Sequence, residues 1–426
     1  MSEQIRKLNR RRFIGLAGLS VLPPLSILAS TATNNDLGND LYLNLNPPAE
    51  NKIATVFETK IICREPGKFF GTQTDYGLNI NGHLIVKKAV IEPDRYLGWP
   101  TITKADNNEL IVAFSGDRDA HVCPWGKTQL IKTTDNGKTW SEPETITNTP
   151  LDDRDAGIIT TQKGTLLVSW FTSIAFERSN FEGAYNRYAR VGEKIGQETK
   201  NKWLGSWVRR SEDRGKTWQN PIPVKVTAPH GPIALNDGRL LYLGRNMLKR
   251  GNEEYFYVQE SIDDGKTWKI LAALPTAGIT TKHLQEPHMV QLNSGKIIGM
   301  FRYQPEKEED HIMMQTESYD GGKTWSLLHT TGILGYPPHI IQLKNNWLLV
   351  VYGRRIKPYG ERACISKDEG ETWDVRNEIT LCNADSRDLG YPSSVQLSDG
   401  SILTIYYQAE KVGSPACLWS THWRLT

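Results

Sequence analysis

Apolar residues along this chain of 426 residues recur in pairs of short runs that are separated by a polar turn. Turns such as Asn236–Gly238, Asn293–Gly295 and Ser398–Gly400 are typical of two-residue β-hairpin connections. The pattern therefore predicts six β-hairpins. The paired runs are Trp99–Ile102 with Ile111–Phe114, Ala156–Ile159 with Leu166–Trp170, Gly231–Ala234 with Leu240–Leu243, Pro287–Val290 with Ile297–Met300, Pro337–Ile340 with Leu348–Val351, and Pro392–Val395 with Ile402–Ile405.

A second repeat, Ser/Thr-x-Asp-x-Gly-x-Thr-Trp, follows five of the six hairpins and is known as the Asp-box. Its aspartate suits the capping of turn amides, its glycine suits a positive φ angle, and its tryptophan suits packing beneath the turn. These residues are predicted to be structural rather than catalytic. The five copies are Thr133–Trp140, Ser211–Trp218, Ser261–Trp268, Ser318–Trp325 and Ser366–Trp373.

Six hairpins, five of them followed by an Asp-box hairpin, predict an all-β fold: a six-bladed β-propeller with four-stranded blades. The sixth blade has its third strand in Pro415–Arg424, and we expect Lys52–Ile62 to supply its outermost strand and close the ring. One domain then spans residues 51–426. A seven-bladed ring, with residues 68–92 forming part of another blade, is the alternative architecture.

The N-terminal segment is predicted to be a targeting signal and not part of the fold. Asn9–Gly15 contains three consecutive arginines before Phe13 and Ile14, and a short apolar run, Leu16–Ala29, follows. This pattern resembles a twin-arginine export signal, which predicts a bacterial protein that is periplasmic or secreted. Residues 1–32 are the expected signal and residues 33–50 a linker; a retained membrane anchor is the alternative.

Composition and charge exclude several classes of protein. Hydrophobic residues make up 38% and charged residues 23% of the chain, which excludes a disordered chain. The formal charge is +3, and leaving out the net +4 of the first 32 residues gives −1, which argues against nucleic acid as the main partner. The five cysteines form no metal-binding or even disulfide pattern, and we predict no metal, no cofactor and no membrane span in the mature chain.

In such a fold, the starts of the first strands, the ends of the second strands and the loops that follow all lie on the face opposite the Asp-box turns. We call the centre of this face the mouth. Chemistry-bearing residues gather at these places, and several of them are arginines. Several arginines at one mouth repel each other unless an anion lies between them, so this pattern favours an acidic glycan as the ligand. Internal salt bridges between these arginines and nearby acidic residues are the alternative explanation. The predicted mouth residues are Gly98, Trp99, Asp117, Arg118, Asp119, His121, Arg154, Asp155, His230, Arg245, Glu286, His288, Arg302, Tyr336, His339, Arg354, Arg355, Arg362 and Tyr391.

With its Asp-boxes and blade order, the chain resembles the sialidase (neuraminidase) superfamily over nearly its whole mature length. Glu286–Arg302 is similar to the family segment that carries a glutamate and an arginine, and Gly390–Val395 to the segment of the nucleophilic tyrosine. The resemblance implies that Glu286 takes the proton of Tyr391. A phenol suits this task because a charged nucleophile would be repelled by the substrate's own carboxylate, although a phenol, with a pKa of ~10, needs a base.

The resemblance also implies an acid/base aspartate after the second strand of blade one, either Asp119, which we favour, or Asp117. It implies substrate contacts from residues around the mouth. One departure stands out, because the family carries an arginine in its first strand where this chain has Leu97–Pro100; Arg95, Arg118 or Arg154 are candidates to replace it. The expected substrate-binding residues are Arg302, Arg362, Arg245, Arg118, Arg355, His121, His288 and Tyr336.

The sequence thus predicts a retaining exo-glycosidase that removes terminal, acidic sugars from glycans and uses no cofactor. Two alternatives remain open. The histidines and tyrosines of the mouth also suit a polysaccharide lyase that acts on uronic-acid glycans, and the missing arginine suits a glycan-binding propeller without activity. A long insertion in blade two, Ser173–Lys202, with Phe176, Phe181, Tyr185, Tyr188 and nearby Trp203, is expected either to wall the pocket or to pack as a flap.

Overall fold

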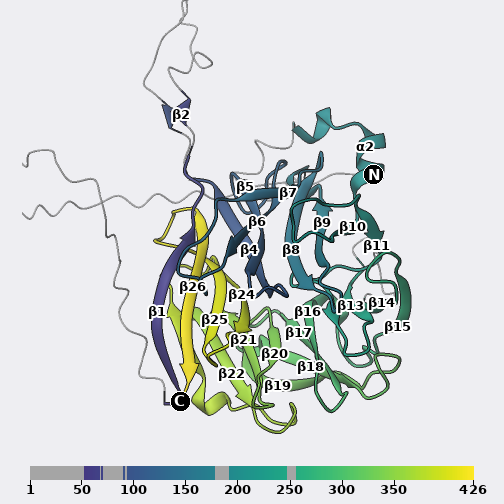
Figure 1. Ribbon diagram of the computed structural model, residues 1–426, viewed down its shortest axis with the longest axis vertical. Helices are drawn as coiled ribbons and strands as arrows, with labels where there is room; N and C mark the ends of the chain where they lie inside the picture. The colour runs from purple at the N-terminus through teal and green to yellow at the C-terminus, as the bar shows by residue number, and fades with distance from the viewer. Residues whose placement is uncertain (1–51, 68, 71–89, 92–93, 178–190, 247–255) are drawn as a thin grey trace, which may run out of the picture. The chain divides into compact units, whose positions relative to one another are not determined.

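In a computed structural model of the protein, the predicted hairpins form six four-stranded antiparallel sheets that are arranged as the blades of a ring (Figure 1). The structure describes residues 52–67, 69–70, 90–91, 94–177, 191–246 and 256–426. Within this part of the chain the six-bladed prediction is confirmed. The expected export signal and linker lie outside the described residues, as do Phe181, Tyr185 and Tyr188 of the insertion.

Each blade runs in chain order from its inner to its outer strand, except that blade six takes its outer strand from the start of the chain. Blade one consists of β4 (Tyr96–Lys104), β5 (Leu110–Arg118), β6 (Lys127–Thr133) and β7 (Glu144–Thr147). Blade two consists of β8 (Asp152–Thr160), β9 (Leu166–Ser173), β10 (Ser206–Ser211) and β11 (Ile222–Val224). Blade three consists of β12 (Ile233–Ala234), β13 (Leu240–Arg245), β14 (Phe256–Ser261) and β15 (Lys269–Ala273). Blade four consists of β16 (Leu284–Gln291), β17 (Ile297–Tyr303), β18 (Ile312–Ser318) and β19 (His329–Leu334). Blade five consists of β20 (His339–Gln342), β21 (Leu348–Arg354), β22 (Gly360–Ser366) and β23 (Ile379–Asn383). Blade six consists of β24 (Leu389–Gln396), β25 (Ile402–Ala409), β26 (Ala416–Leu425) and β1 (Ala54–Cys63).

The ring is closed by the pairing of the two ends of the described chain, as the sequence predicts. Strand β1, purple in Figure 1, runs antiparallel to β26, yellow, with Ala54 opposite Leu425 and Cys63 opposite Leu418. Within the ring, β4 contacts both β8 and β24, so the first blade packs between the second and the sixth. This closure covers the edge of β26, which would otherwise be an unpaired edge strand.

The Asp-boxes are turns held together by one aspartate each, also as predicted. In blade three, Asp263 accepts hydrogen bonds from the amide and hydroxyl of Thr267, at 2.9 and 2.6 Å, and from Ser261 at 2.8 Å. Gly265 has a φ of 83°, and its carbonyl accepts a hydrogen bond from the indole of Trp268 at 3.1 Å. The boxes therefore stabilise the outer hairpins and stand on the face opposite the mouth.

Other elements are short. The pair β2 (Phe69–Phe70) and β3 (Val90–Ile91) forms a separate two-stranded sheet and not a seventh blade. The insertion contributes η1 (Ala175–Glu177) and α2 (Gln197–Trp203), and further short helices are η3 (Thr281–His283), η4 (Glu308–Asp310) and η5 (Val375–Asn377). No helix in the described part of the chain is long and apolar enough to cross a membrane. Buried apolar clusters lie between neighbouring blades, such as Leu97, Val112, Ile405 and Leu418 between blades one and six.

Candidate functional site

Four inner strands begin with the same local distortion, and each distortion presents one side chain at the mouth. The register of the pairing slips at Trp99, Asp155, Glu286 and Tyr391. All four residues have a left-handed backbone, with φ between 47° and 54°. Such β-bulges re-aim a side chain and cost conformational strain, and they occur preferentially beside functional sites. In three of the four blades a proline follows the bulged residue, which is a signal that the sequence offered and that our sequence analysis did not use.

The structure brings the proposed nucleophile and base into direct contact. The hydroxyl of Tyr391 donates a hydrogen bond to Glu286 Oε1 at 2.6 Å, and Arg302 Nη1 donates to Glu286 Oε2 at 2.7 Å. Tyr391 is 4% exposed. Burial and the charge of Glu286 hold the pKa of the Tyr391 phenol well above its usual value. This phenol can therefore become a nucleophile only if a base takes its proton at the moment of attack.

Two arginines flank this pair and stack on its aromatic neighbours. The guanidinium of Arg302 lies 4.3 Å from the ring centroid of Tyr336, and that of Arg355 lies 5.5 Å from the ring of Tyr391. Arg355 donates to the carbonyl of Leu389 and, at 3.0 Å, to the hydroxyl of Tyr407. No carboxylate among the described residues forms an ion pair with Arg355, so its charge is left for another anion.

Asp155 is a buried carboxyl group at the mouth with a raised pKa. It is 8% exposed, and together with Arg245 and Glu286 it lines a cavity of about 140 Å³. Burial raises the pKa of Asp155 to about 7, while Arg154 opposes and Glu286 adds to this shift. Sequence reasoning placed Asp155 and Arg245 at the mouth, and the structure brings them together with the base Glu286.

Trp99 belongs to Leu97–Pro100, the segment in which the resemblance calls for an arginine, and two arginines from elsewhere in the chain lie against its ring. The guanidinium of Arg154 lies 4.6 Å from the Trp99 ring centroid and that of Arg118 lies 4.9 Å from it. His121 approaches the same ring edge-on, with centroids 4.9 Å apart. Burial and the charges of Arg154 and Arg355 hold the pKa of His121 well below its ordinary value, so this histidine is neutral.

The two candidate acid/base aspartates are engaged with cations. Arg95 Nε donates to Asp117 Oδ1 at 2.9 Å, and Arg95 also forms an ion pair with Asp119. Lys127 forms a second ion pair with Asp117. Arg95, one of the candidates for the missing arginine, is therefore committed to these aspartates.

Two predicted substrate-binding arginines are buried in main-chain contacts instead. Arg118 is completely buried, forms an ion pair with Asp152 at 2.7 Å and donates to the carbonyl of Asp153. Arg362 is 2% exposed and donates to the carbonyls of Glu361 and Cys382. Their guanidinium groups stabilise the blades, whereas Arg355, another of the expected substrate-binding residues, lies beside Tyr391.

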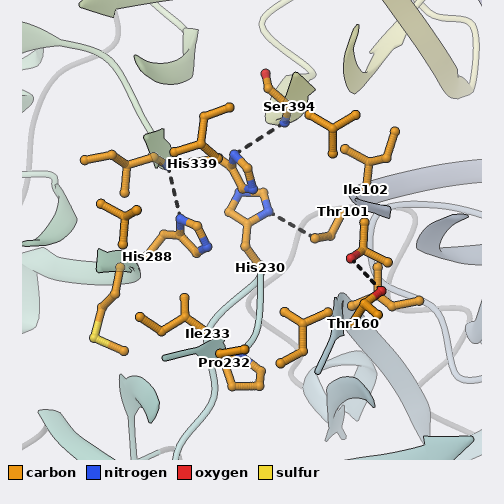
Figure 2. A pocket seen from close by; sticks show the side chains of 18 of the residues that line it. Thr101, Ile102, Thr160, His230, Pro232, Ile233, His288, His339 and Ser394 are labelled. Carbon is orange, nitrogen blue, oxygen red and sulfur yellow. Dashed lines mark hydrogen bonds between the residues drawn. The ribbon is translucent and has the colours of Figure 1, made fainter. Parts of the chain in front are cut away.

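His288 lies inside the ring and not at the mouth. With His230 and His339 it lines an axial cavity of about 440 Å³, in which the three rings converge (Figure 2). The Nδ1 atoms of His288 and His339 accept hydrogen bonds from the amides of Ile340 and Ser394. Their Nε2 atoms must then carry protons, which does not suit a metal ligand. No group of three or more potential ligands in the described residues has a metal-binding arrangement.

The comparison with known families decides the identity of the fold. Residues 82–275 and, overlapping them, residues 188–404 match the family described as the BNR repeat-like domain. The two matches together cover well over half of the sequence. The chain belongs to this family. No curated protein matches the sequence of this BNR propeller.

Solved structures confirm the sialidase-like architecture of the BNR propeller. It is similar to a protein of unknown function from Dyadobacter fermentans, with a TM-score of 0.66 and 21% identity over 88% of this chain and 99% of that one. The NanB sialidase of Streptococcus pneumoniae has a TM-score of 0.56 and 15% identity, over 78% of this chain and 68% of that one. An α-L-arabinanase of Penicillium chrysogenum has a TM-score of 0.54 and 14% identity, over 86% and 98%. These likenesses show a glycoside hydrolase-like propeller fold.

The described part of the blade-two insertion packs against the BNR propeller close to the mouth. Phe176 is completely buried and clusters with Val122 and Cys123, which follow His121 in the loop between β5 and β6. Trp203 contacts Trp207 of β10 with ring centroids 5.6 Å apart. The insertion thus braces the loop that carries His121.

Proposed function

We propose that this propeller is an exo-acting glycoside hydrolase that removes terminal, acidic sugars from glycans by a retaining mechanism with Tyr391 as the nucleophile. One observation carries the proposal: the phenol of Tyr391 donates to Glu286 at 2.6 Å, and Arg302 fixes the other oxygen of the same carboxylate. A nucleophile, its base and a group that orients the base are the parts that covalent catalysis requires.

The chemistry follows from these contacts. Glu286 takes the phenolic proton while the Tyr391 oxygen attacks the anomeric carbon, and the bond to the leaving oxygen breaks. Arg302 and Arg355 both favour the phenolate, because their charges oppose the burial and the carboxylates that raise the pKa of Tyr391. Water then cleaves the covalent glycosyl–tyrosine, the proton returns to the phenol, and the sugar is released with its configuration retained.

The acidic nature of the sugar is supported by unpaired charge. Among the described residues, neither Arg154 nor Arg355 forms an ion pair with a carboxylate, and Nε of Arg154 is buried without a hydrogen-bond partner. Two such guanidinium groups close to Trp99 and Tyr391 favour a carboxylate of the substrate as their partner. A tyrosine nucleophile suits the same substrate, since a charged nucleophile would be repelled.

The proposal is tested by a screen of aryl glycosides of sialic and uronic acids, with neutral rhamnosides as comparison. We expect hydrolysis of an acidic glycoside, with the first-formed anomer retained in proton NMR spectra. Tyr391→Phe and Glu286→Gln should each abolish most of this activity, whereas Tyr319→Phe, a change of an exposed tyrosine in the Asp-box of blade four, should leave it unchanged. Near-normal turnover by Tyr391→Phe on the true substrate would overturn the assignment.

A polysaccharide lyase is the second candidate function, and the neutral state of His121 at the mouth favours it. A neutral imidazole close to cationic Arg355 is suited to abstract a proton next to a uronate carboxylate. Incubation with acidic polysaccharides separates the two reactions, because a lyase produces an unsaturated uronate that absorbs ultraviolet light and a hydrolase does not.

A further inference from the structure

Three titratable side chains from the first and last blades form a hydrogen-bonded chain at the mouth. Tyr96 Oη lies 3.1 Å from His121 Nδ1 and donates to Asp388 Oδ1 at 2.8 Å. His121 follows β5, Tyr96 opens β4, and Asp388 immediately precedes β24. We call these three residues the His121 relay.

Both ends of the relay are partly exposed, and its middle is buried. The side chains of His121 and Asp388 are 43% and 39% exposed, whereas Tyr96 is 4% exposed. Because Tyr96 occupies Nδ1, Nε2 is the ring nitrogen that remains available to a ligand. The ring is held edge-on against Trp99 with centroids 4.9 Å apart, and Trp99 in turn lies edge-on to Tyr391 at 6.4 Å. His121 and Tyr391 thus contact the same indole ring.

The charged groups around the relay determine where a proton resides. Four arginines act on His121, namely Arg154, Arg355, Arg118 and Arg302, and with burial they disfavour an imidazolium. Burial also keeps the phenol of Tyr96 protonated and raises the pKa of Asp388, which Arg355 opposes. The carboxyl group of Asp388 is thus the member of the relay that gains and loses a proton.

We propose that His121 is the acid/base residue of this site, and that it passes a proton between the glycosidic oxygen and Asp388 by way of Tyr96. The inference rests on the proposed function and deepens it. Tyr96 and Asp388 act through His121 and are positioning residues.

The proton count balances in both half-reactions. In the acid form, Asp388 donates to Tyr96, Tyr96 donates to Nδ1, and Nε2 carries a proton. Nε2 gives this proton to the leaving oxygen as the glycosidic bond breaks, Nδ1 takes the proton of Tyr96, and Tyr96 takes that of Asp388. In the second half-reaction water gives a proton to Nε2 as it attacks the glycosyl–tyrosine, and the transfers run in reverse until Asp388 is protonated again.

This assignment moves the acid/base role away from Asp117 and Asp119. Both carboxylates pair with Arg95, and Lys127 binds Asp117 as well. The relay also avoids an imidazolium, which the surrounding arginines would penalise, because the ring accepts a proton on one nitrogen as it loses one from the other.

Leaving-group dependence tests the proposal. A poor leaving group needs an acid catalyst, whereas a good leaving group departs without one. The test therefore compares a methyl glycoside, with a poor leaving group, and a 4-nitrophenyl glycoside, with a good one, of the acidic sugar that the wild type cleaves. The variants are His121→Gln, Tyr96→Phe and Asp388→Asn. We expect a loss of about 10²–10⁴-fold in kcat/KM on the methyl glycoside and much less on the aryl glycoside. His329→Gln, on outer strand β19, is the control and should alter neither.

The same assay separates a failure of the relay from a failure of the proposed function. If Tyr391→Phe loses activity on both glycosides while the relay variants lose the two activities equally or not at all, the proposed function stands and the relay is wrong. If Tyr391→Phe keeps its activity, the proposed function itself fails.

A second measurement needs no substrate. Nitrogen NMR of histidine-labelled protein distinguishes the two neutral tautomers, and Nε2 of His121 should change from acceptor to donor in one pH step as Asp388 gains its proton. Asp388→Asn and Tyr96→Phe should remove this step. An ordinary imidazolium titration of His121, or one tautomer at every pH, would overturn the proposal.

Discussion

Arg154 stacks on Trp99, with its guanidinium carbon 4.6 Å from the centroid of the indole ring. The two residues come from neighbouring inner strands, β4 and β8, and both belong to or adjoin a left-handed bulge. The segment Leu97–Pro100, which contains Trp99, lacks the arginine that the resemblance to sialidases calls for in the first blade. Arg154 of the second blade places a positive charge beside the Trp99 ring.

Arg154→Met should weaken the binding of acidic sugars, because methionine keeps much of the packing on Trp99 and removes the charge. A charged hydrogen bond contributes about 1.5–3 kcal/mol, which corresponds to a loss of affinity of roughly 10- to 100-fold. The measurement is the dissociation constant or KM for an acidic sugar and for its neutral amide. Arg154→Lys should recover part of the loss, and an equal loss for the acid and the amide would contradict the prediction.

Asp155→Asn should stabilise the protein above neutral pH. The pKa of Asp155 is raised from an ordinary 3.8 to about 7, so the folded state binds this proton more tightly than the unfolded state. The stability it contributes is present below about pH 4 and is lost as the pH rises towards 7. Since a pKa unit is worth about 1.4 kcal/mol, the variant should gain up to roughly 4 kcal/mol relative to wild type between pH 4 and pH 8.

Urea unfolding at several pH values checks this, with Asp320→Asn as a control of opposite sign. Asp320 lies in the Asp-box of blade four, where hydrogen bonds from Thr324 lower its pKa to about 2. Its contribution is present above the unfolded pKa and is lost as the pH falls. A wild-type-like pH dependence for Asp155→Asn would contradict the assignment of a raised pKa.

The blade count and the mouth could be predicted from the sequence because both follow from repeats with a local physical cause. Hairpin turns and Asp-boxes fix the strand order, and strand order alone places Tyr391 and Glu286 on one face. Side-chain direction within a strand end could not be predicted in the same way. Arg355 and Arg362 lie close together in the sequence, yet only Arg355 stacks on Tyr391, while Arg362 turns to the carbonyl of Cys382.

The axial histidines illustrate the same limit. His288 lies only two residues after Glu286, but the bulge at Glu286 shifts the register of the strand. Glu286 therefore reaches Tyr391, whereas His288 points into the axial cavity (Figure 2). Pro287 marks the bulge in the sequence, but the direction of His288 follows from the backbone register beyond it, which the hairpin pattern does not fix.

Trp423→Ala should be among the most destabilising substitutions away from the site. Trp423 is completely buried on β26, donates to Thr404 at 2.9 Å and lies opposite Val56 of β1, where the ring closes. Removing a buried tryptophan costs about 3–5 kcal/mol. Denaturant unfolding measures this, with Arg424→Ala, its exposed neighbour, as the control; a similar small effect for both would show that the closure contributes little.

Glu361→Gln should leave the binding of acidic sugars unchanged at neutral pH. Glu361 is completely buried on β22. Burial raises its pKa well above the ordinary value, although Arg355 and Arg362 oppose the shift. The group is therefore neutral in the folded protein, and it does not neutralise Arg355, whose charge stays available to a substrate.

The raised pKa of Glu361 in the wild type also predicts a difference in the pH dependence of stability between the wild type and the variant. The stability contributed by Glu361 is present below its unfolded pKa and is lost as the pH rises towards the folded value, so Glu361→Gln should be increasingly more stable than wild type at alkaline pH. Titration calorimetry with an acidic sugar at pH 7 and urea unfolding between pH 7 and pH 9 measure the two effects. Tighter binding by the variant at pH 7 would mean that Glu361 is ionised and already neutralises Arg355. Arg355 would then no longer support the proposal that the substrate is acidic.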